Sequence, residues 1–172
     1  MKVAIVGLWP ETRDQAWADP SAEKWGLAWD QEVFRLDRAF EIHLPCEWKD
    51  NGISDYIERL NMMPRLYLQE AHPEVPHAEV YPLAEVAKTT GDYFSSSVAY
   101  LMALAIHEGA EEIGLYGVAM EGHDEYGYQR PNMEYLVGLA RGRGIKVHIP
   151  EQSPLCKYGR QYGYSTGYGR FD

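Results

Sequence analysis

The sequence predicts a single α/β domain with a three-layer, Rossmann-like arrangement and a mostly parallel sheet of five or six strands. Short apolar or β-branched runs alternate with segments of helical periodicity, the pattern of parallel strands joined by crossover helices. Residues 3–6 and 112–118 lack the apolar–polar alternation of half-exposed strands, so we expect both inside the sheet. The 172 residues suffice for one domain with its own core.

The first half of the chain supplies four predicted strands and one helix. Residues 51–62 carry apolar side chains on one helical face, whereas residues 70–82 contain three prolines and are expected to form a connection. Pro45 should stop the strand before it. The strands expected here are residues 3–6, 25–29, 38–44 and 65–69.

The second half begins with a serine cluster that can cap an apolar helix, and Gly109 should end that helix. Residues 112–118 then form a strand, and residues 119–130 leave its carboxyl end as a loop. Pro131 is expected in the first turn of the following helix, since proline is favoured there. Residues 145–149 supply the last strand.

The domain is expected to span residues 1–157, followed by a tyrosine- and glycine-rich arm at residues 158–172. The arm has no apolar periodicity but many tyrosines, so it is either an ordered arm against a partner subunit or a flexible tail. We predict a homo-oligomer with this arm at the interface.

Composition excludes several classes of protein. A net charge of -10 argues against nonspecific binding to a nucleic-acid backbone. No apolar run approaches the length that spans a bilayer and no secretory segment is visible, so we expect a cytoplasmic protein that does not bind membranes. Cys46 and Cys156 lack CxxC partners and are expected to be reduced, and His72 and His77 lack supporting ligands, so no metal site is predicted.

The first strand runs directly into Gly7, and Thr12 follows after a short turn. In many α/β proteins such a turn leaves backbone amides free for a phosphate or ribose, so Gly7 and Thr12 are candidate ligand-binding residues. Neither GxGxxG nor GxxxxGK[ST] is present. The nearby tryptophans are interpreted as a packed lid over the sheet edge, with base stacking as the alternative: Trp9, Trp17, Trp25 and Trp29.

The serine cluster and the loop that follows residues 112–118 are expected at the same sheet edge. A helix start that combines serine hydroxyls with free amides and the positive end of the helix dipole suits an anion, which makes Ser95, Ser96 and Ser97 candidate binding residues. Gly117 at the strand end and Tyr126 in the loop complete this set.

Three residues of the loop are candidates for chemistry. Glu121, His123 and Asp124 offer a carboxylate and imidazole pair for general acid and base work, and the alternative is a solvated acidic loop. Arg130 precedes Pro131, where its guanidinium could bind a phosphate or instead pair with Glu134.

The central segment resembles bacterial sialyltransferases that use CMP-sialic acid, and related pterin diphosphokinase-like Rossmann proteins. The resemblance rests on the serine cluster, the helix ending at Gly109, the strand with Gly117, the loop with Tyr126 and the opening turn at Gly7. It implies that Ser96 and Ser97 face a nucleotide phosphate or ribose and that Tyr126 donates to a phosphate oxygen.

The whole chain, including the segment EYGYQRPNMEYLVGLARGRGIKVHIP, resembles small proteins encoded by tailed bacteriophages, which implies a fold but no activity. Two functions are open. The first is a nucleotide-dependent, glycosyltransferase-like enzyme whose acidic loop supplies a base or a metal ligand. The second is a noncatalytic protein in the host cytoplasm that binds a small nucleotide or a host protein. A nucleotide-type ligand is expected in both.

Overall fold

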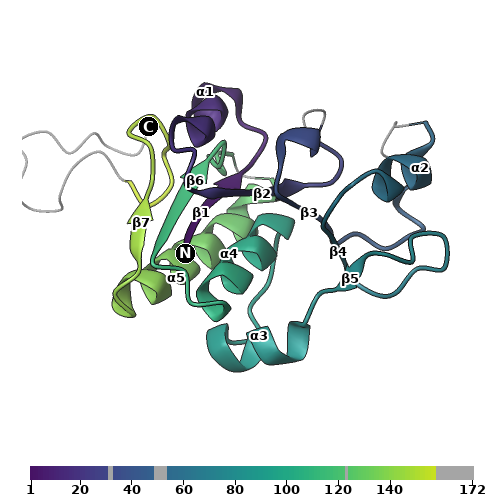
Figure 1. Ribbon diagram of the computed structural model, residues 1–172. Coiled ribbons are helices and arrows are strands. Elements are labelled where there is room, and N and C mark those ends of the chain that lie inside the picture. The colour runs from purple at the N-terminus through teal and green to yellow at the C-terminus, as the bar shows by residue number, and fades with distance from the viewer. Residues whose placement is uncertain (31–32, 49–53, 123, 158–172) are drawn as a thin grey trace, which may run out of the picture.

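The computed structural model describes residues 1–30, 33–48, 54–122 and 124–157 (Figure 1). The predicted arm at 158–172 and His123 lie outside these residues, as does part of the predicted helix at 51–62. The described strands are β1 (Lys2–Val6), β2 (Glu23–Leu27), β3 (Arg38–Glu41), β4 (Leu66–Leu68), β5 (Glu79–Val80), β6 (Glu112–Tyr116) and β7 (Lys146–His148).

These seven strands form one parallel sheet in the order β5-β4-β3-β2-β1-β6-β7. The predicted α/β class with a parallel sheet is confirmed. Strand β1 lies between β2 and β6, and β6 lies between β1 and β7, so the two strands expected in the interior are there.

The described sheet has seven strands, whereas five or six were expected and six strand ranges were named. The additional strand, β5, falls inside the proline-rich segment that was interpreted as a connection, where Leu68 pairs with Val80 and the N–H of Tyr81 donates to the carbonyl of Leu68 at 2.8 Å. A two-residue edge strand needs hydrogen bonds on one side only, so prolines just outside it are tolerated.

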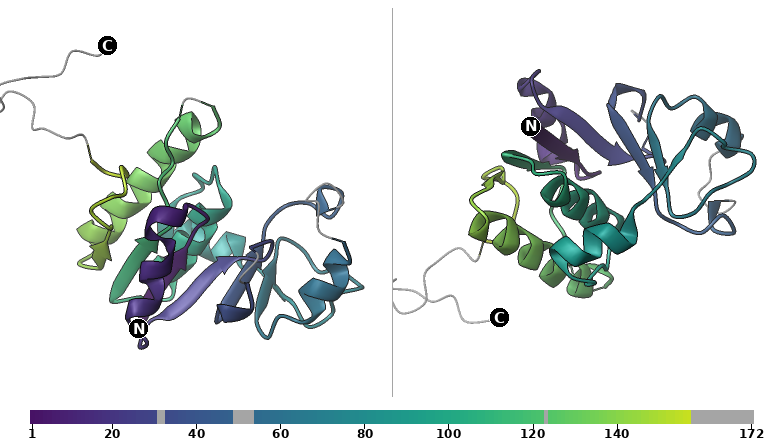
Figure 2. Two further views of the ribbon diagram at one scale, coloured as in Figure 1. Left: turned by 90° about the horizontal axis from the view of Figure 1, so that it is seen from above. Right: turned by 60° about the horizontal axis from the view of Figure 1, so that its bottom comes forward.

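Alternation along the strands divides the core into two layers. On β1, Val3 and Ile5 belong to one buried cluster, and Ala4 and Val6 belong to the other. Figures 1 and 2 show α3, α4 and α5 together on one side of the sheet and α1 on the other. The helical elements are α1 (Pro10–Arg13), η1 (Asp14–Ala18), η2 (Val33–Arg35), α2 (Tyr56–Asn61), α3 (Leu83–Thr90), α4 (Ser97–His107) and α5 (Tyr126–Gly142).

Helix α4 is the central element of the larger layer. Its residues from Leu101 to Ile106 are buried, and the helix packs against β1, β2 and β3. Gly109, with a φ of +74°, ends it as predicted: its N–H donates to the carbonyl of Ile106, and the N–H of Ala110 donates to the carbonyl of Ala105. These two bonds satisfy carbonyls that the last helical turn would otherwise leave open.

The start of α5 corrects the sequence interpretation. Pro131 was expected in the first turn, but the helix begins at Tyr126 and Pro131 lies inside it. The turn before Pro131 is held by tertiary contacts: the hydroxyl of Ser95 donates to the carbonyl of Tyr128 at 3.2 Å, and the guanidinium of Arg130 donates to the carbonyl of Pro154 at 2.8 Å. These contacts override the usual bias against helix before proline. Residues 126–130 are therefore helical and not part of a loop.

Candidate functional site

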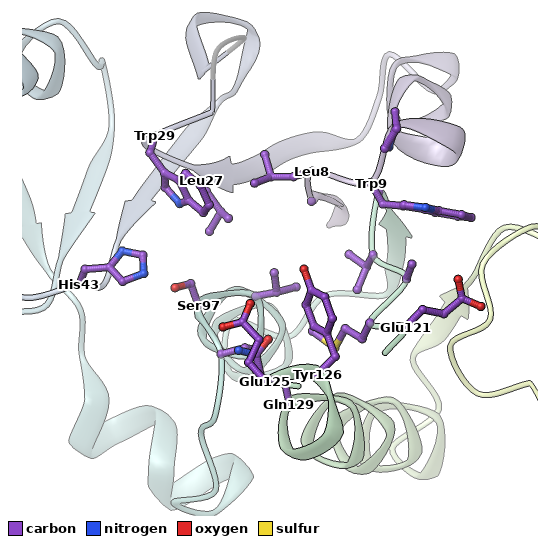
Figure 3. Close-up of a pocket in the computed structure, with 18 residues that line it drawn as sticks. Leu8, Trp9, Leu27, Trp29, His43, Ser97, Glu121, Glu125, Tyr126 and Gln129 are labelled. Carbon is purple, nitrogen blue, oxygen red and sulfur yellow. The ribbon is translucent and has the colours of Figure 1, made fainter. Parts of the chain in front are cut away.

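A cleft of about 620 Å³ opens at the carboxyl ends of the central strands (Figure 3). The ends of β1, β2, β3 and β6 contribute to it, together with the first residues of α4 and α5. The cleft is lined by Gly7, Leu8, Trp9, Pro10, Leu27, Trp29, His43, Ser96, Ser97, Val98, Gly117, Val118, Ala119, Met120, Glu121, Glu125, Tyr126 and Gln129.

The position of the cleft follows from the strand order. The chain builds β1 to β5 toward one edge of the sheet and then returns to place β6 on the other side of β1. The connections that leave β1 and β6 therefore diverge, because the elements that follow β1 and the helix that follows β6 cover opposite faces. In open α/β sheets such a reversal point is where ligands bind.

The floor of the cleft is a tight junction between the ends of β1 and β6. The N–H of Gly7 donates to the carbonyl of Tyr116 at 2.7 Å, and the N–H of Trp9 donates to the carbonyl of Gly117 at 2.9 Å. Thr12 is fully buried, and its hydroxyl accepts from the N–H of Gly117 at 2.9 Å. Gly7 and Gly117 line the cleft. Thr12 does not line it, but its hydrogen bond to Gly117 holds the junction in place.

The three predicted serines have three different environments. Ser96 is the N-cap of α4, and its hydroxyl accepts from the N–H of Ala99 at 3.3 Å. Ser97 is the first residue of α4 and faces the cleft (Figure 3). Ser95 does not line the cleft: its N–H and hydroxyl both bond the buried side chain of Asn132 at 3.1 Å. Ser97 is thus the serine best placed to meet a ligand.

The rim opposite β2 comes from the start of α5. Tyr126 is 40% exposed and lines the cleft with Glu121, Glu125 and Gln129 (Figure 3). Asp124 is not among the lining residues, and His123 lies outside the described part of the chain.

Arg130 faces away from the cleft. Its guanidinium donates to Glu134 at 2.8 Å and to the carbonyl of Pro154 at 2.8 Å. Of the two roles considered for Arg130, the structure shows the pairing with Glu134, within α5. The bond to the carbonyl of Pro154 joins α5 to the segment after β7.

His43, which the sequence analysis did not single out, lines the cleft at the end of β3. Its Nδ1 lies 2.6 Å from a carboxylate oxygen of Glu41, whose side chain is only 2% exposed. The hydrogen bond to Glu41 raises the pKa of His43 above its ordinary value of 6.5. A charged residue in the middle of the apolar run RAFEIHL was the available signal.

The cleft combines apolar walls with few charges. Trp29 and Leu27 line one side, and Val98, Val118 and Met120 supply further apolar surface. Among its described lining residues none is Lys or Arg, so the His43 imidazole is the side chain there that can carry positive charge. An anionic ligand would depend on backbone amides, hydroxyls and the N-terminus of α4.

The described residues include candidate metal ligands and two cysteines, and their surroundings are as follows. None of their His, Cys, Asp and Glu side chains gather into a group of three that could hold a metal ion. His72 packs against Trp48, with ring centroids 5.0 Å apart. Cys46 and Cys156 are free and exposed.

Among the helices that the structure describes, none has the length and apolar character needed to span a membrane.

Known proteins resemble this chain in structure but not in sequence. No protein-family model matches the sequence, and no curated protein is significantly similar to it. The fold is similar to that of the sialyltransferase CstII from Campylobacter jejuni, solved in complex with the substrate analogue CMP-3FNeuAc. The TM-score is 0.60 and the identity 15%, over 89% of this chain and 80% of that one. The similarity establishes a shared Rossmann-like fold.

Proposed function

We propose that the protein binds a nucleotide or nucleotide-sugar in the cleft between β1, β2, β6 and the N-terminus of α4, as a glycosyltransferase-like enzyme. The observation that carries this proposal is the convergence of four strand ends and the N-termini of α4 and α5 on a single cleft of about 620 Å³. Pockets of this size bury a drug-sized ligand.

Named residues suit the parts of such a ligand. Ser97 and the first amides of α4 would bind a phosphate, and the hydroxyl of Tyr126 would reach it from the opposite rim. Trp29 and Leu27 offer a flat apolar wall for a base. The similarity of the fold to a sialyltransferase in complex with a CMP-sugar analogue supports this class of ligand.

Titration calorimetry with CMP, UDP, GDP and their sugar conjugates tests the proposal. The double variant Ser97→Ala with Tyr126→Phe removes two hydroxyls, each contributing about 0.5 to 1.5 kcal/mol, so we expect affinity to fall roughly tenfold or more. The melting temperature should hardly change, because neither hydroxyl has a hydrogen bond in the described part of the protein.

The matched control is Ser21→Ala with Tyr128→Phe. Both residues are exposed and neither lines the cleft, so nucleotide affinity should stay at the wild-type value. Failure of the wild-type protein to bind any nucleotide, or equal binding by the double variant, would refute the assignment of the site.

A second candidate is a noncatalytic binding protein, which the absence of Lys and Arg among the described lining residues favours. Binding without release of nucleotide from any nucleotide-sugar would identify it. For such a binding protein we propose a role in a host cytoplasm, where a host protein is the alternative partner.

A further inference from the structure

The most unusual side chain near the cleft is a carboxylate buried in a strand. Glu41 is the last residue of β3, and its side chain is 2% exposed. Burying a charged carboxylate is costly unless it is paired and hydrogen-bonded. Among the described residues, His43 is the one group paired with it that can carry positive charge.

Both oxygens of the Glu41 carboxylate are occupied. One accepts from the backbone N–H of His43 at 2.9 Å and lies 2.6 Å from His43 Nδ1. The other accepts from the hydroxyl of Tyr56, a buried residue at the start of α2. The indole N–H of Trp48 donates to the carbonyl of His43 at 3.1 Å and fixes the backbone at this point.

These contacts orient the imidazole. Because the carboxylate accepts, Nδ1 carries the proton in the neutral ring, and Nε2 is left with a lone pair. The side chain of His43 is 43% exposed, and in Figure 3 its ring points into the space between Trp29 and Ser97. Trp29 meets it edge-on, with centroids 6.2 Å apart. The available nitrogen therefore faces the cleft.

We propose that His43 is the catalytic base of the cleft, with Glu41 and Tyr56 as its positioning residues. This inference rests on the proposed function, because it requires a nucleotide-sugar in the cleft. The carboxylates at the opposite rim, Glu121 and Glu125, are exposed and have no orienting side-chain partner within the described residues. The role of proton acceptor is thus assigned to His43, after the end of β3, and no longer to the acidic loop.

The reaction is transfer of the sugar to a hydroxyl of an acceptor or of water. The hydroxyl oxygen forms a bond to the anomeric carbon as Nε2 of His43 takes the hydroxyl proton. The bond between the anomeric carbon and the phosphate oxygen breaks, and its electron pair leaves with the nucleotide. His43 becomes an imidazolium that Glu41 stabilises, and it later returns the proton to solvent.

The charges around His43 determine the pH dependence. Glu41 and Glu47 both raise the pKa of the imidazole, partial burial lowers it, and the net direction is upward. Only the neutral ring can accept a proton. We therefore expect kcat to rise with pH through the elevated pKa of His43 and then to level off.

The first experiment measures His43 directly, without a substrate. Long-range 1H–15N spectra recorded against pH should show the neutral ring with its proton on Nδ1 and a pKa above the ordinary 6.5. Glu41→Gln should lower that pKa, because the amide cannot stabilise the imidazolium as a carboxylate does. A neutral ring protonated on Nε2, or a pKa unchanged in Glu41→Gln, would overturn the positioning role.

The second experiment measures nucleotide release from CMP-, UDP- and GDP-sugars alongside calorimetric binding. His43→Gln should lower kcat about 100-fold or more and abolish the rise of kcat with pH, with little change in nucleotide affinity. His107→Gln is the matched control: His107 is an exposed histidine at the far end of α4, and kcat should be unchanged.

The two proposals fail in different ways. Nucleotide binding without turnover of any conjugate, or wild-type kcat in His43→Gln, refutes the base and leaves the binding site standing. Absence of binding to every nucleotide refutes the proposed function and, with it, a base acting on such a ligand.

Discussion

The carbonyl oxygen of Gly117 occupies the place where a side chain on Gly7 would begin. A Cβ atom added to Gly7 would lie 2.3 Å from that oxygen, and one added to Gly117 would lie 2.5 Å from the carbonyl oxygen of Gly7. The backbones of β1 and β6 thus meet at the floor of the cleft, and both contacts are with main-chain atoms that have little freedom to move.

Alanine at either glycine should therefore destabilise the protein. We expect Gly7→Ala to lower the free energy of unfolding by about 1 to 3 kcal/mol, the usual cost of overpacking. Gly117→Ala should cost at least as much, because Gly117 has a φ of +67°. Urea denaturation measures both. Gly138→Ala is the control: nothing lies within 4 Å of its added Cβ, and alanine favours the helix. Stabilities of both variants equal to wild type would contradict this account.

Ser96 and Ser97 are adjacent but should respond differently. Ser96→Ala removes the N-cap of α4, and we expect a loss of about 0.5 to 2 kcal/mol in the free energy of unfolding. Ser97→Ala removes no hydrogen bond in the described structure and should stay within about 0.5 kcal/mol of wild type. Thermal and urea denaturation of the two single variants make the comparison, and equal effects would show that the cap is assigned to the wrong serine.

Asn132 joins the segment before α4 to α5. It is fully buried, accepts from the N–H of Ser95 at 3.1 Å, and donates to the carbonyl of Tyr93 at 2.6 Å. Asn132→Ala would leave both main-chain groups without this partner, so we expect a loss of about 1 to 3 kcal/mol. The Ser95 amide should also exchange faster with deuterium. Asn61→Ala, at an exposed asparagine, serves as control, and an unchanged Ser95 exchange rate in Asn132→Ala would contradict the prediction.

The pairing of His43 with Glu41 predicts a pH-dependent contribution to stability. Because the pKa of His43 is raised in the folded state, this contribution is fully present below the unfolded pKa near 6.5 and is lost as pH rises through the higher folded value. The difference in unfolding free energy between wild type and His43→Gln should therefore be larger at about pH 6 than at about pH 9. A constant difference across that range would contradict a raised pKa.

The arm at residues 158–172 carries the prediction of a homo-oligomer. Its tyrosines and glycines are suited to an interface with a partner subunit. Light scattering should give a mass above that of one chain, and deletion of residues 158–172 should reduce it. If the full chain is a monomer and remains one after the deletion, the prediction of a homo-oligomer with this arm at the interface is wrong.

Local patterns determined much of the fold. Apolar runs in the sequence located six of the strands that the structure describes, because a buried parallel strand needs apolar side chains on both faces. The serine cluster and Gly109 located the two ends of α4, since capping depends on residues within one turn. Strand β5 and helix α3 were missed because a two-residue strand and an eight-residue helix carry too little periodicity to be recognised.

Tertiary structure decided which residues share the site. The sequence placed Gly7, Ser96, Ser97, Gly117 and Tyr126 at one sheet edge, and all five line the cleft. It could not show that Ser96 caps α4, that Ser95 binds Asn132 and that Ser97 faces the cleft. The partner of Ser95, Asn132, lies 37 positions away in the sequence. Nor could the sequence show that Arg130 binds Glu134 and the carbonyl of Pro154 and does not line the cleft. The buried Glu41 and its partners His43 and Tyr56 meet only when β3 and α2 pack together, because the cost of burying a carboxylate depends on neighbours that folding alone supplies.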